Sequence, residues 1–352
     1  MNETEFRILD ILSKEIGNPM SINKLTEKIK QTHGTAYYTN IHAETQRLAE
    51  QKTLRLEKSG KSLIAELNFE NYLLIDLLAE LELIRKHRFL EKRPEFQMIM
   101  LELNTYIKDI SIIKSIAIIE PEKNAKLNRI ELLFILRKTE DKKQLSDLEN
   151  IMQSLQQIHT IRIDSLFLSD EKFIELLKSE EANTAKEILS NKIILFHPQT
   201  FWMEIREAIE KGTRIKIEHE TNPNKISEED TAYNLARFGY KEIGTKITHG
   251  KQIGIEYLIT SLLLKGTARR IEAIPIIIAK NENKINYNLL LFLSKKYKIF
   301  SELYGILKAV NQIKPMKTLM KLLKGDIAKG QKNIKYNLDE MEKKMRLYNV
   351  FE

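Results

Sequence analysis

The sequence contains no cysteine in its 352 residues. This absence excludes a disulfide framework, a thiolate metal site and a cysteine nucleophile, and it fits a reducing compartment. The apolar stretch at residues 273–279 is far shorter than the ~20 residues that span a bilayer. The first residues carry Glu3, Glu5 and Asp10 where a secretory signal would carry basic residues. We therefore expect a cytoplasmic protein that does not enter a membrane.

Several catalytic signatures are also missing. There is no Gly-x-Ser-x-Gly sequence and no glycine-rich loop that could cradle a phosphate. The seven histidines are scattered, and none forms a close metal-ligand pair. We expect His197, which precedes Pro198, to be a turn residue rather than a ligand. The sequence predicts no metal site and no cofactor.

The charge is distributed unevenly along the chain. Hydrophobic residues make up 42% and charged residues 30%, which is typical of a folded globular protein. Residues 1–70 hold ten Lys/Arg and ten Asp/Glu, residues 71–240 hold 25 and 29, and residues 241–352 hold 22 and 10. The positive excess therefore lies in the last third. A basic region attracts polyanions such as a phosphate backbone, and a solvated lysine-rich surface is the alternative.

Residues 1–70 follow the order of a winged helix-turn-helix. Apolar residues at three- and four-residue steps predict a first helix that contains Phe6, Leu9, Leu12 and Ile16. Ser21 suits the N-cap of a second helix, and a third helix is expected over residues 36–51. The residues expected on the inner face of that third helix are Tyr37, Ile41 and Leu48. Two alternating strands, at 54–57 and 63–67, follow with a basic turn between them.

The outward face of the third helix carries groups that can hydrogen-bond to base edges in a major groove. The candidate base-reading residues are Tyr38, Asn40, His42, Ala43, Gln46 and Arg47. The turn between the strands is expected to contact phosphates, which position a protein but do not specify sequence. Its candidate residues are Lys58, Ser59, Lys61 and Ser62. Winged helices also bind proteins, so a protein partner is the alternative.

This segment resembles the winged helix-turn-helix domains of archaeal transcriptional regulators. The likeness is carried by residues 36–41, Arg47-Leu48 and residues 57–62, and it covers about a fifth of the chain. It implies binding to double-stranded DNA. Because winged helices gain affinity by pairing on two half-sites, it also implies a homodimer.

Residues 71–222 alternate helical and strand-like segments, which predicts an α/β domain behind a helical linker. The expected helices are 71–93, 95–110, 143–158, 170–178 and 184–189, and the expected strands are 112–119, 130–136, 160–168 and 192–196. The second half is similar to the tail of small archaeal nucleotidyltransferases of the DNA polymerase beta superfamily. The likeness is carried by residues 163–173, 187–189, 193–197 and 201–202.

The resemblance implies nucleotidyl transfer, which needs a Gly-Ser pair after the first strand and carboxylates on two later strands that hold two metal ions. This chain has Glu120-Pro121 at the first place, and Arg129 and Glu131 where two carboxylates are needed. Only Glu131 and Asp164 remain as weak catalytic candidates. We therefore expect no enzymatic activity, and a degenerate domain that serves as a scaffold or dimerisation unit.

Residues 223–352 are expected to form a basic, all-helical domain, with helices at 228–238, 253–264, 267–280, 286–297 and 300–311. A short strand or sheet edge is expected at 213–218, and Pro275 should kink its helix. Arg269 and Arg270 begin a helix and should meet an anion such as phosphate or Glu272. A shared helix face with apolar residues behind it is expected to carry further candidate nucleic-acid contacts, Lys314, Lys317, Lys321 and Lys324. A solvated amphipathic face is the alternative reading of these lysines.

Together these features predict an α+β protein of three domains, 1–70, 71–222 and 223–352. We expect a DNA-binding transcriptional regulator or chromosome-associated factor, associated with the nucleoid. One alternative is an active nucleotidyltransferase on RNA or protein, whose nucleotide incorporation Glu131→Ala would abolish. Another is a noncatalytic interaction module of a toxin-antitoxin-like system.

Overall fold

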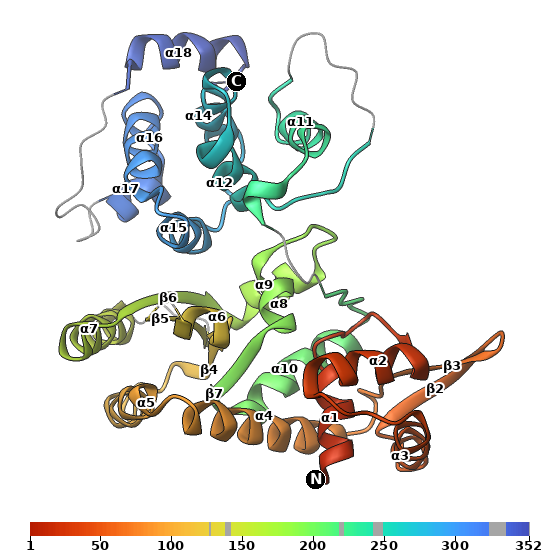
Figure 1. The fold of residues 1–352 in the computed structure, drawn as a ribbon. Helices are drawn as coiled ribbons and strands as arrows, with labels where there is room; N and C mark the ends of the chain where they lie inside the picture. Colours follow the sequence, from red (N-terminus) through yellow and green to blue (C-terminus); the bar gives the residue numbers. More distant parts are fainter. Residues whose placement is uncertain (127, 138–141, 218–221, 242–248, 324–335, 352) are drawn as a thin grey trace. The chain divides into compact units, whose positions relative to one another are not determined.

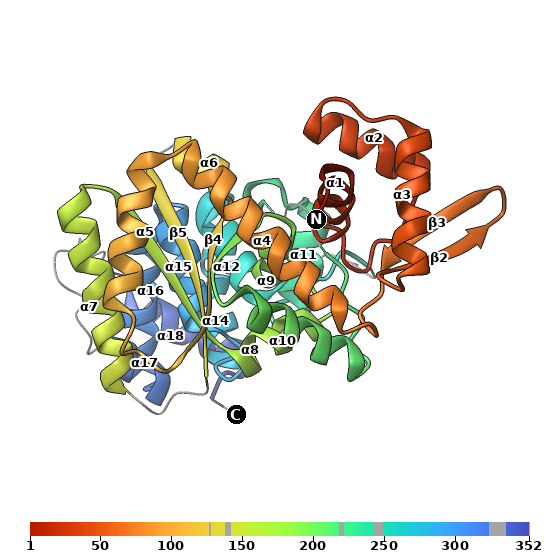
Figure 2. The ribbon, with the colours of Figure 1, turned by 90° about the horizontal axis from the view of Figure 1, so that it is seen from below.

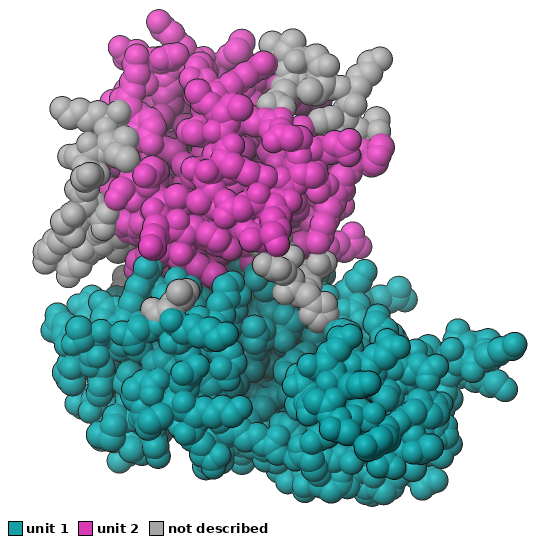
Figure 3. All heavy atoms as spheres, viewed as in Figure 1, with its two compact units in different colours: residues 1–179, 184–219 teal, residues 180–183, 220–352 magenta. Residues whose placement is uncertain are grey.

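The computed structural model describes residues 1–126, 128–137, 142–217, 222–241, 249–323 and 336–351. It is a mixed α+β structure, which confirms the predicted class. The chain divides into two compact units, residues 1–179 with 184–219 and residues 180–183 with 220–352 (Figure 3). Within the described ranges, no helix is both long and apolar enough to cross a membrane.

The first unit begins with three helices and a small sheet of strand order β1-β3-β2 (Figure 1). These elements are α1 (Glu3–Leu12), β1 (Met20–Ser21), α2 (Ile22–His33), α3 (Tyr38–Glu50), β2 (Leu54–Ser59) and β3 (Ser62–Leu67). Ser21 caps α2 as predicted, since its hydroxyl accepts a hydrogen bond from the Lys24 amide. The β2–β3 hairpin closes at the Ser59–Ser62 pair. The predicted helix and hairpin order is confirmed, and we call residues 1–70 the winged module.

The expectation that Tyr37 lies on the inner face of the third helix is wrong. Helix α3 begins at Tyr38, so Tyr37 precedes the helical periodicity as its N-cap residue and is 65% exposed. The buried face consists instead of Ile41, Thr45 and Leu48. The Thr45 hydroxyl is buried without penalty because it donates to the Ile41 carbonyl at 2.6 Å.

A second sheet, of strand order β6-β5-β4-β7, forms the middle of the first unit. Its strands are β4 (Ile113–Ile119), β5 (Arg129–Leu136), β6 (Arg162–Ser169) and β7 (Lys192–Phe196). Strands β5 and β6 are parallel, and the other two pairs are antiparallel. A short helix, α6 (Pro121–Lys126), lies between β4 and β5, where no helix was predicted. It starts with a proline, whose missing amide hydrogen costs nothing at a first helical position.

Helices cover both faces of this sheet. They are α4 (Leu73–Glu91), α5 (Pro94–Tyr106), α7 (Lys142–His159), α8 (Asp170–Lys178), α9 (Thr184–Ser190) and α10 (Pro198–Glu210). Helices α5 and α7 pack together beside β4 and β5 (Figure 2), where Ile116 and Phe134 join their core. The alternate residues Ala117 and Leu133 are buried too, and α8 and α10 contact the sheet. Burial on both faces explains why these strands are continuous apolar runs.

The segment after α10 does not form the expected strand over its described part, residues 213–217. It is fixed to the loop that follows α1: the Ile217 amide donates to the Ile16 carbonyl at 3.1 Å, and the Asn18 side chain donates to the Ile217 carbonyl at 3.2 Å. Gly17 lies at φ +76°, and a Cβ atom there would stand 1.6 Å from the Ile215 carbonyl oxygen. Only glycine permits this close approach.

The described part of the second unit is helical, apart from one isolated bridge. Its elements are a 3₁₀ turn (Pro223–Lys225), α11 (Glu228–Arg237), α12 (Ile255–Lys265), α13 (Ala268–Ile271), α14 (Ala273–Lys280), α15 (Tyr287–Lys296), α16 (Phe300–Ile313), α17 (Lys317–Leu323) and α18 (Leu338–Leu347). The single helix expected over 267–280 is wrong, because the chain breaks at Glu272. Pro275 then falls in the first turn of α14, where an amide has no intrahelical partner.

Candidate nucleic-acid interface

The outward face of α3 carries most of the predicted base-reading residues. Tyr38, Asn40, Ala43 and Gln46 are exposed. His42 is half-buried, with its ring 5.6 Å from that of Tyr38. This face also exposes Thr39 and Glu50, which were not among the predicted base-reading residues. The exposure of both residues could have been predicted from the buried face, because both lie opposite Ile41, Thr45 and Leu48 on the helix.

Arg47 is engaged within the module. Its guanidinium lies 2.6 Å from a carboxylate oxygen of Glu44 and 3.4 Å from one of Glu5 on α1. The hydrogen bonds that Arg47 donates to Glu44 raise the pKa of Arg47 above its ordinary value. Arg47 can read a base only by leaving these two carboxylates, so its predicted role is less favoured by the geometry than those of Asn40 and Gln46.

The turn of the β2–β3 hairpin presents all four predicted phosphate-contacting residues to solvent, Lys58, Ser59, Lys61 and Ser62. Gly60 lies at φ +60°, the left-handed conformation that a tight hairpin turn requires. Lys58 and Lys61 form no ion pair with any residue that the structure describes. Two exposed ammonium groups on a narrow projection are suited to phosphate contact.

The winged module is neutral in formal charge, but its charges are not equally available. Seven of its ten carboxylates form ion pairs within the first unit, namely Glu3, Glu5, Asp10, Glu15, Glu44, Glu66 and Glu70. The lysines that are exposed and form no ion pair with a described residue are Lys24, Lys30, Lys52, Lys58 and Lys61. Three carboxylates are likewise exposed and form no ion pair with a described residue, namely Glu27, Glu50 and Glu57. The surface therefore has an excess of available cations, which the sequence counts alone conceal.

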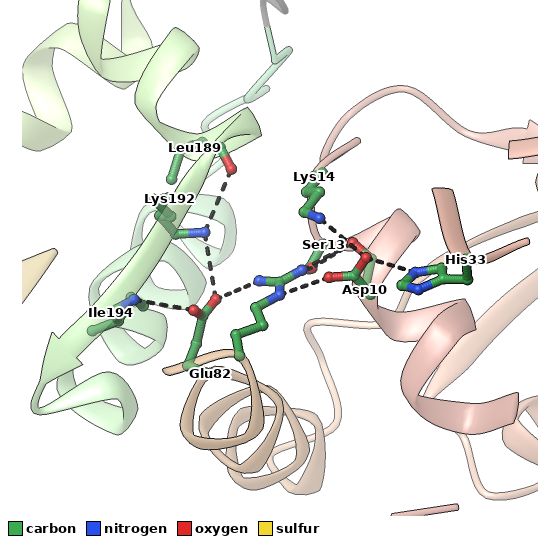
Figure 4. A network of polar contacts seen from close by, with 9 residues as sticks. Asp10, Ser13, Lys14, His33, Glu82, Leu189, Lys192 and Ile194 are labelled. Carbon is green, nitrogen blue, oxygen red and sulfur yellow. Dashed lines mark hydrogen bonds and ion pairs between the residues drawn. The ribbon is translucent and has the colours of Figure 1, made fainter. Parts of the chain in front are cut away.

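A buried network of charges joins α1 of the winged module to α4 (Figure 4). The Arg85 guanidinium contacts Asp10 at 2.7 Å and Glu82 at 2.6 Å, and it also donates to the Ser13 hydroxyl at 2.7 Å. Burial by itself would raise the pKa of Asp10, but Arg85 and the hydrogen bonds from His33 and Lys14 hold it well below its usual range. The network fixes the winged module on the helix that follows it.

The same network extends to the second sheet. Glu82 accepts a hydrogen bond from the Ile194 amide at 3.1 Å and lies 3.6 Å from the Lys192 ammonium. Lys192 is buried over the ring of Trp202, at 4.5 Å from its centroid. Burial lowers the pKa of Lys192 to about 8. Long-range ion pairs of this kind are hard to predict from the sequence. Their sign is a charged residue on an otherwise apolar face of a helix.

The low pKa of Lys192 predicts a pH dependence of stability. Between pH 8 and 10.5 the unfolded chain holds the Lys192 proton more tightly than the folded chain does, so the free energy of unfolding should rise with pH. This group should contribute up to about 1.4 kcal/mol per pH unit in that window and nothing below it. Urea denaturation of the parent and of Lys192→Met from pH 7 to 10.5 measures the difference. Parallel stability curves would show that Lys192 keeps its ordinary pKa.

The two weak catalytic candidates lie side by side on the parallel strands, because Glu131 pairs in register with Asp164. Each has an arginine two residues before it: Arg129 lies 2.7 Å from Glu131, and Arg162 lies 2.8 Å from Asp164. Glu131 is fully buried. In the described part of the chain, no group of three or more His, Cys, Asp or Glu residues is placed to hold a metal ion.

Glu120, at the end of β4, stands where the Gly-Ser pair was sought. It lies at φ +44° and pairs with Lys123 at 2.9 Å. The following Pro121 starts α6. A carboxylate and a proline here offer a triphosphate neither a hydroxyl nor a pair of amide donors.

The basic candidates of the second unit are dispersed. Arg270 pairs with Glu228, whereas the expected partner Glu272 pairs with Lys344 at 2.6 Å. Arg269 is exposed.

The predicted shared face of four lysines is wrong for Lys314. It is the C-cap of α16, and its ammonium donates to the carbonyls of Ala279 and Val350 at 3.2 and 3.0 Å. Lys317 and Lys321 belong to α17, and Lys324 lies outside the described residues.

Comparison of the chain with protein-family models, with curated proteins and with solved structures finds no match.

Proposed function

We propose that the winged module binds double-stranded DNA and that the chain is a transcriptional regulator or chromosome-associated factor. The observation that carries this proposal is the joint exposure of one α3 face and of the β2–β3 turn, on a module whose own carboxylates are mostly paired internally. In this arrangement α3 enters the major groove and the turn contacts the flanking backbone.

The chemistry of the α3 face supports sequence reading by amides. Asn40 and Gln46 are exposed, and each can form a bidentate pair with adenine. Tyr38 and Ala43 add apolar surface that can contact a thymine methyl group. Because Arg47 is paired with Glu44 and Glu5, specificity is assigned to the amides, while Lys58 and Lys61 supply affinity.

The middle of the first unit is proposed to act as a noncatalytic scaffold, in a protein that pairs as a homodimer on two half-sites. Its support is the pairing of both candidate carboxylates with arginines. A two-metal centre needs these oxygens as metal ligands, and a neighbouring guanidinium competes for them. No observation specifically favours the transferase alternative.

A fluorescence anisotropy titration of the full chain with a labelled DNA duplex tests the proposal. We expect binding at 50 mM salt that weakens at 200 mM, because phosphate contacts release counterions. Absence of binding at the lower salt would overturn DNA binding. Binding that ignores salt would overturn the contacts to the backbone.

A further inference from the structure

A cavity of about 710 Å³ lies inside the first unit, between the winged module and the end of α10. Its apolar lining includes Ala65 and Leu67 of β3, Ile209 of α10 and Ile215. Its size falls within the range of roughly 300–1,000 Å³ that small-molecule sites occupy. No residue of this cavity takes part in the α3 face or the hairpin turn.

The carboxylates that line the cavity already have counter-ions. Glu15 pairs with Lys28, Glu66 and Glu70 pair with Arg55, and Glu210 pairs with Arg206 at 2.6 Å. Two lining cations, Arg214 and Lys216, are exposed and form no ion pair with a described residue. The available charge at the cavity is therefore positive, although its lining contains more acids than bases.

We propose that this cavity binds a small organic anion with an apolar body. The body lies against Pro19, Leu67 and Ile209, and the anionic head group is held by Arg214 and Lys216. An apolar lining with a few convergent charged groups is the usual design of a ligand site. A guanidinium and an ammonium together favour a carboxylate, sulfonate or phosphate head.

The position of the cavity links it to the winged module. One wall is the segment that hydrogen-bonds to Ile16 and Asn18, and the other includes Arg55 of β2 and the strand β3. The phosphate-contacting turn joins β2 to β3, so a ligand here touches both strands that carry it. If the ligand binds the DNA-bound chain and the free chain with different affinities, it must change the affinity of the chain for DNA by the ratio of those two affinities. This regulatory step depends on the proposed function, whereas ligand binding does not.

Binding is tested without DNA, using the fluorescent probe anilinonaphthalene sulfonate, which combines aromatic rings with an anionic head. We expect a saturable component in the parent that octanoate displaces and octanol does not. The exposed double variant Arg214→Ala/Lys216→Ala should weaken this component about tenfold or more, since hydrogen bonds to charged groups are lost. The matched control Lys92→Ala/Lys108→Ala, two exposed lysines of the same unit away from the cavity, should leave it unchanged.

Equal weakening in both variants, or equal displacement by octanoate and octanol, would overturn the anion site. A second titration measures the affinity of the chain for a DNA duplex that carries a red-fluorescent label. It is made with and without a saturating concentration of anilinonaphthalene sulfonate. A change in the parent that is absent from Arg214→Ala/Lys216→Ala supports regulation, and an unchanged affinity in the parent refutes it. If the duplex does not bind at all, the proposed function fails while the probe result still decides the site.

Discussion

Replacing Arg85 with methionine is expected to lower the free energy of unfolding by about 3–5 kcal/mol, the usual cost of breaking a buried ion pair. Arg85 is almost fully buried and lies between Asp10 and Glu82 at hydrogen-bond distance from both. Without it, two buried carboxylates lose their closest cation. The desolvation cost of these charges remains, while the attraction that offset it is gone.

Urea denaturation of Arg85→Met against the parent measures this loss, with Arg88→Met as the matched control. Arg88 lies on the same helix, but its partner Glu3 is exposed and its second contact is the face of the Phe6 ring, 4.0 Å away, so its removal should cost only about 1–2 kcal/mol. Equal losses in the two variants would show that the buried network does not hold the winged module on α4. The triple variant Asp10→Asn/Glu82→Gln/Arg85→Met should recover part of the loss.

The second large effect is expected at the buried pair of Arg129 and Glu131 in β5. Arg129→Met should destabilise the fold by about 3–5 kcal/mol, because it leaves the fully buried Glu131 without the guanidinium 2.7 Å away. Adding Glu131→Gln should restore much of the stability, since the neutral amide is cheaper to bury than a carboxylate. The arginine would thus be a structural cation on which the strand depends.

Arg162→Met is the matched control for this experiment. Arg162 occupies the same place before Asp164, but its side chain is 38% exposed. Asp164 is buried, but water can reach the place that the exposed Arg162 guanidinium leaves, so this removal should cost less than that of Arg129. Urea denaturation of Arg129→Met, Arg129→Met/Glu131→Gln and Arg162→Met measures the three changes in the free energy of unfolding. A cost at Arg129 no larger than at Arg162, or no recovery in the double variant, would contradict a structural role for the pair.

Local patterns in the sequence were sufficient to predict most elements of the first unit. Ser21 caps the helix that it was expected to cap, and the helix over Asp170–Lys178 has the predicted bounds. These successes share a cause, because caps and apolar periodicity act within a few residues of each other. The α3 face could likewise be predicted, since its exposed residues follow from two buried ones.

Features that depend on distant partners could not be predicted. Arg85 and Asp10 are 75 residues apart, and nothing in either local sequence names the other. The contact of Arg47 with Glu5 on α1, at 3.4 Å, exists only in the fold, although its closer partner Glu44 lies three residues away on the same helix. Lys314 was placed on a shared face because the pattern did not show that its ammonium caps two carbonyls, those of Ala279 and Val350. Tertiary hydrogen bonds overrode the local pattern at Arg85 and Lys314, whereas the hydrogen bonds of Arg47 go to Glu44 on its own helix.

The most direct test of the proposed DNA contact compares salt dependences. Anisotropy titrations at several salt concentrations would be made for the parent, for Lys58→Ala/Lys61→Ala and for the control Lys92→Ala/Lys108→Ala. If the two turn lysines each neutralise one phosphate, their removal should reduce the slope of log affinity against log salt by about 1.8, and the control should keep the parent slope. An unchanged slope in Lys58→Ala/Lys61→Ala, with DNA still bound, would contradict the assignment of the hairpin turn to the DNA backbone.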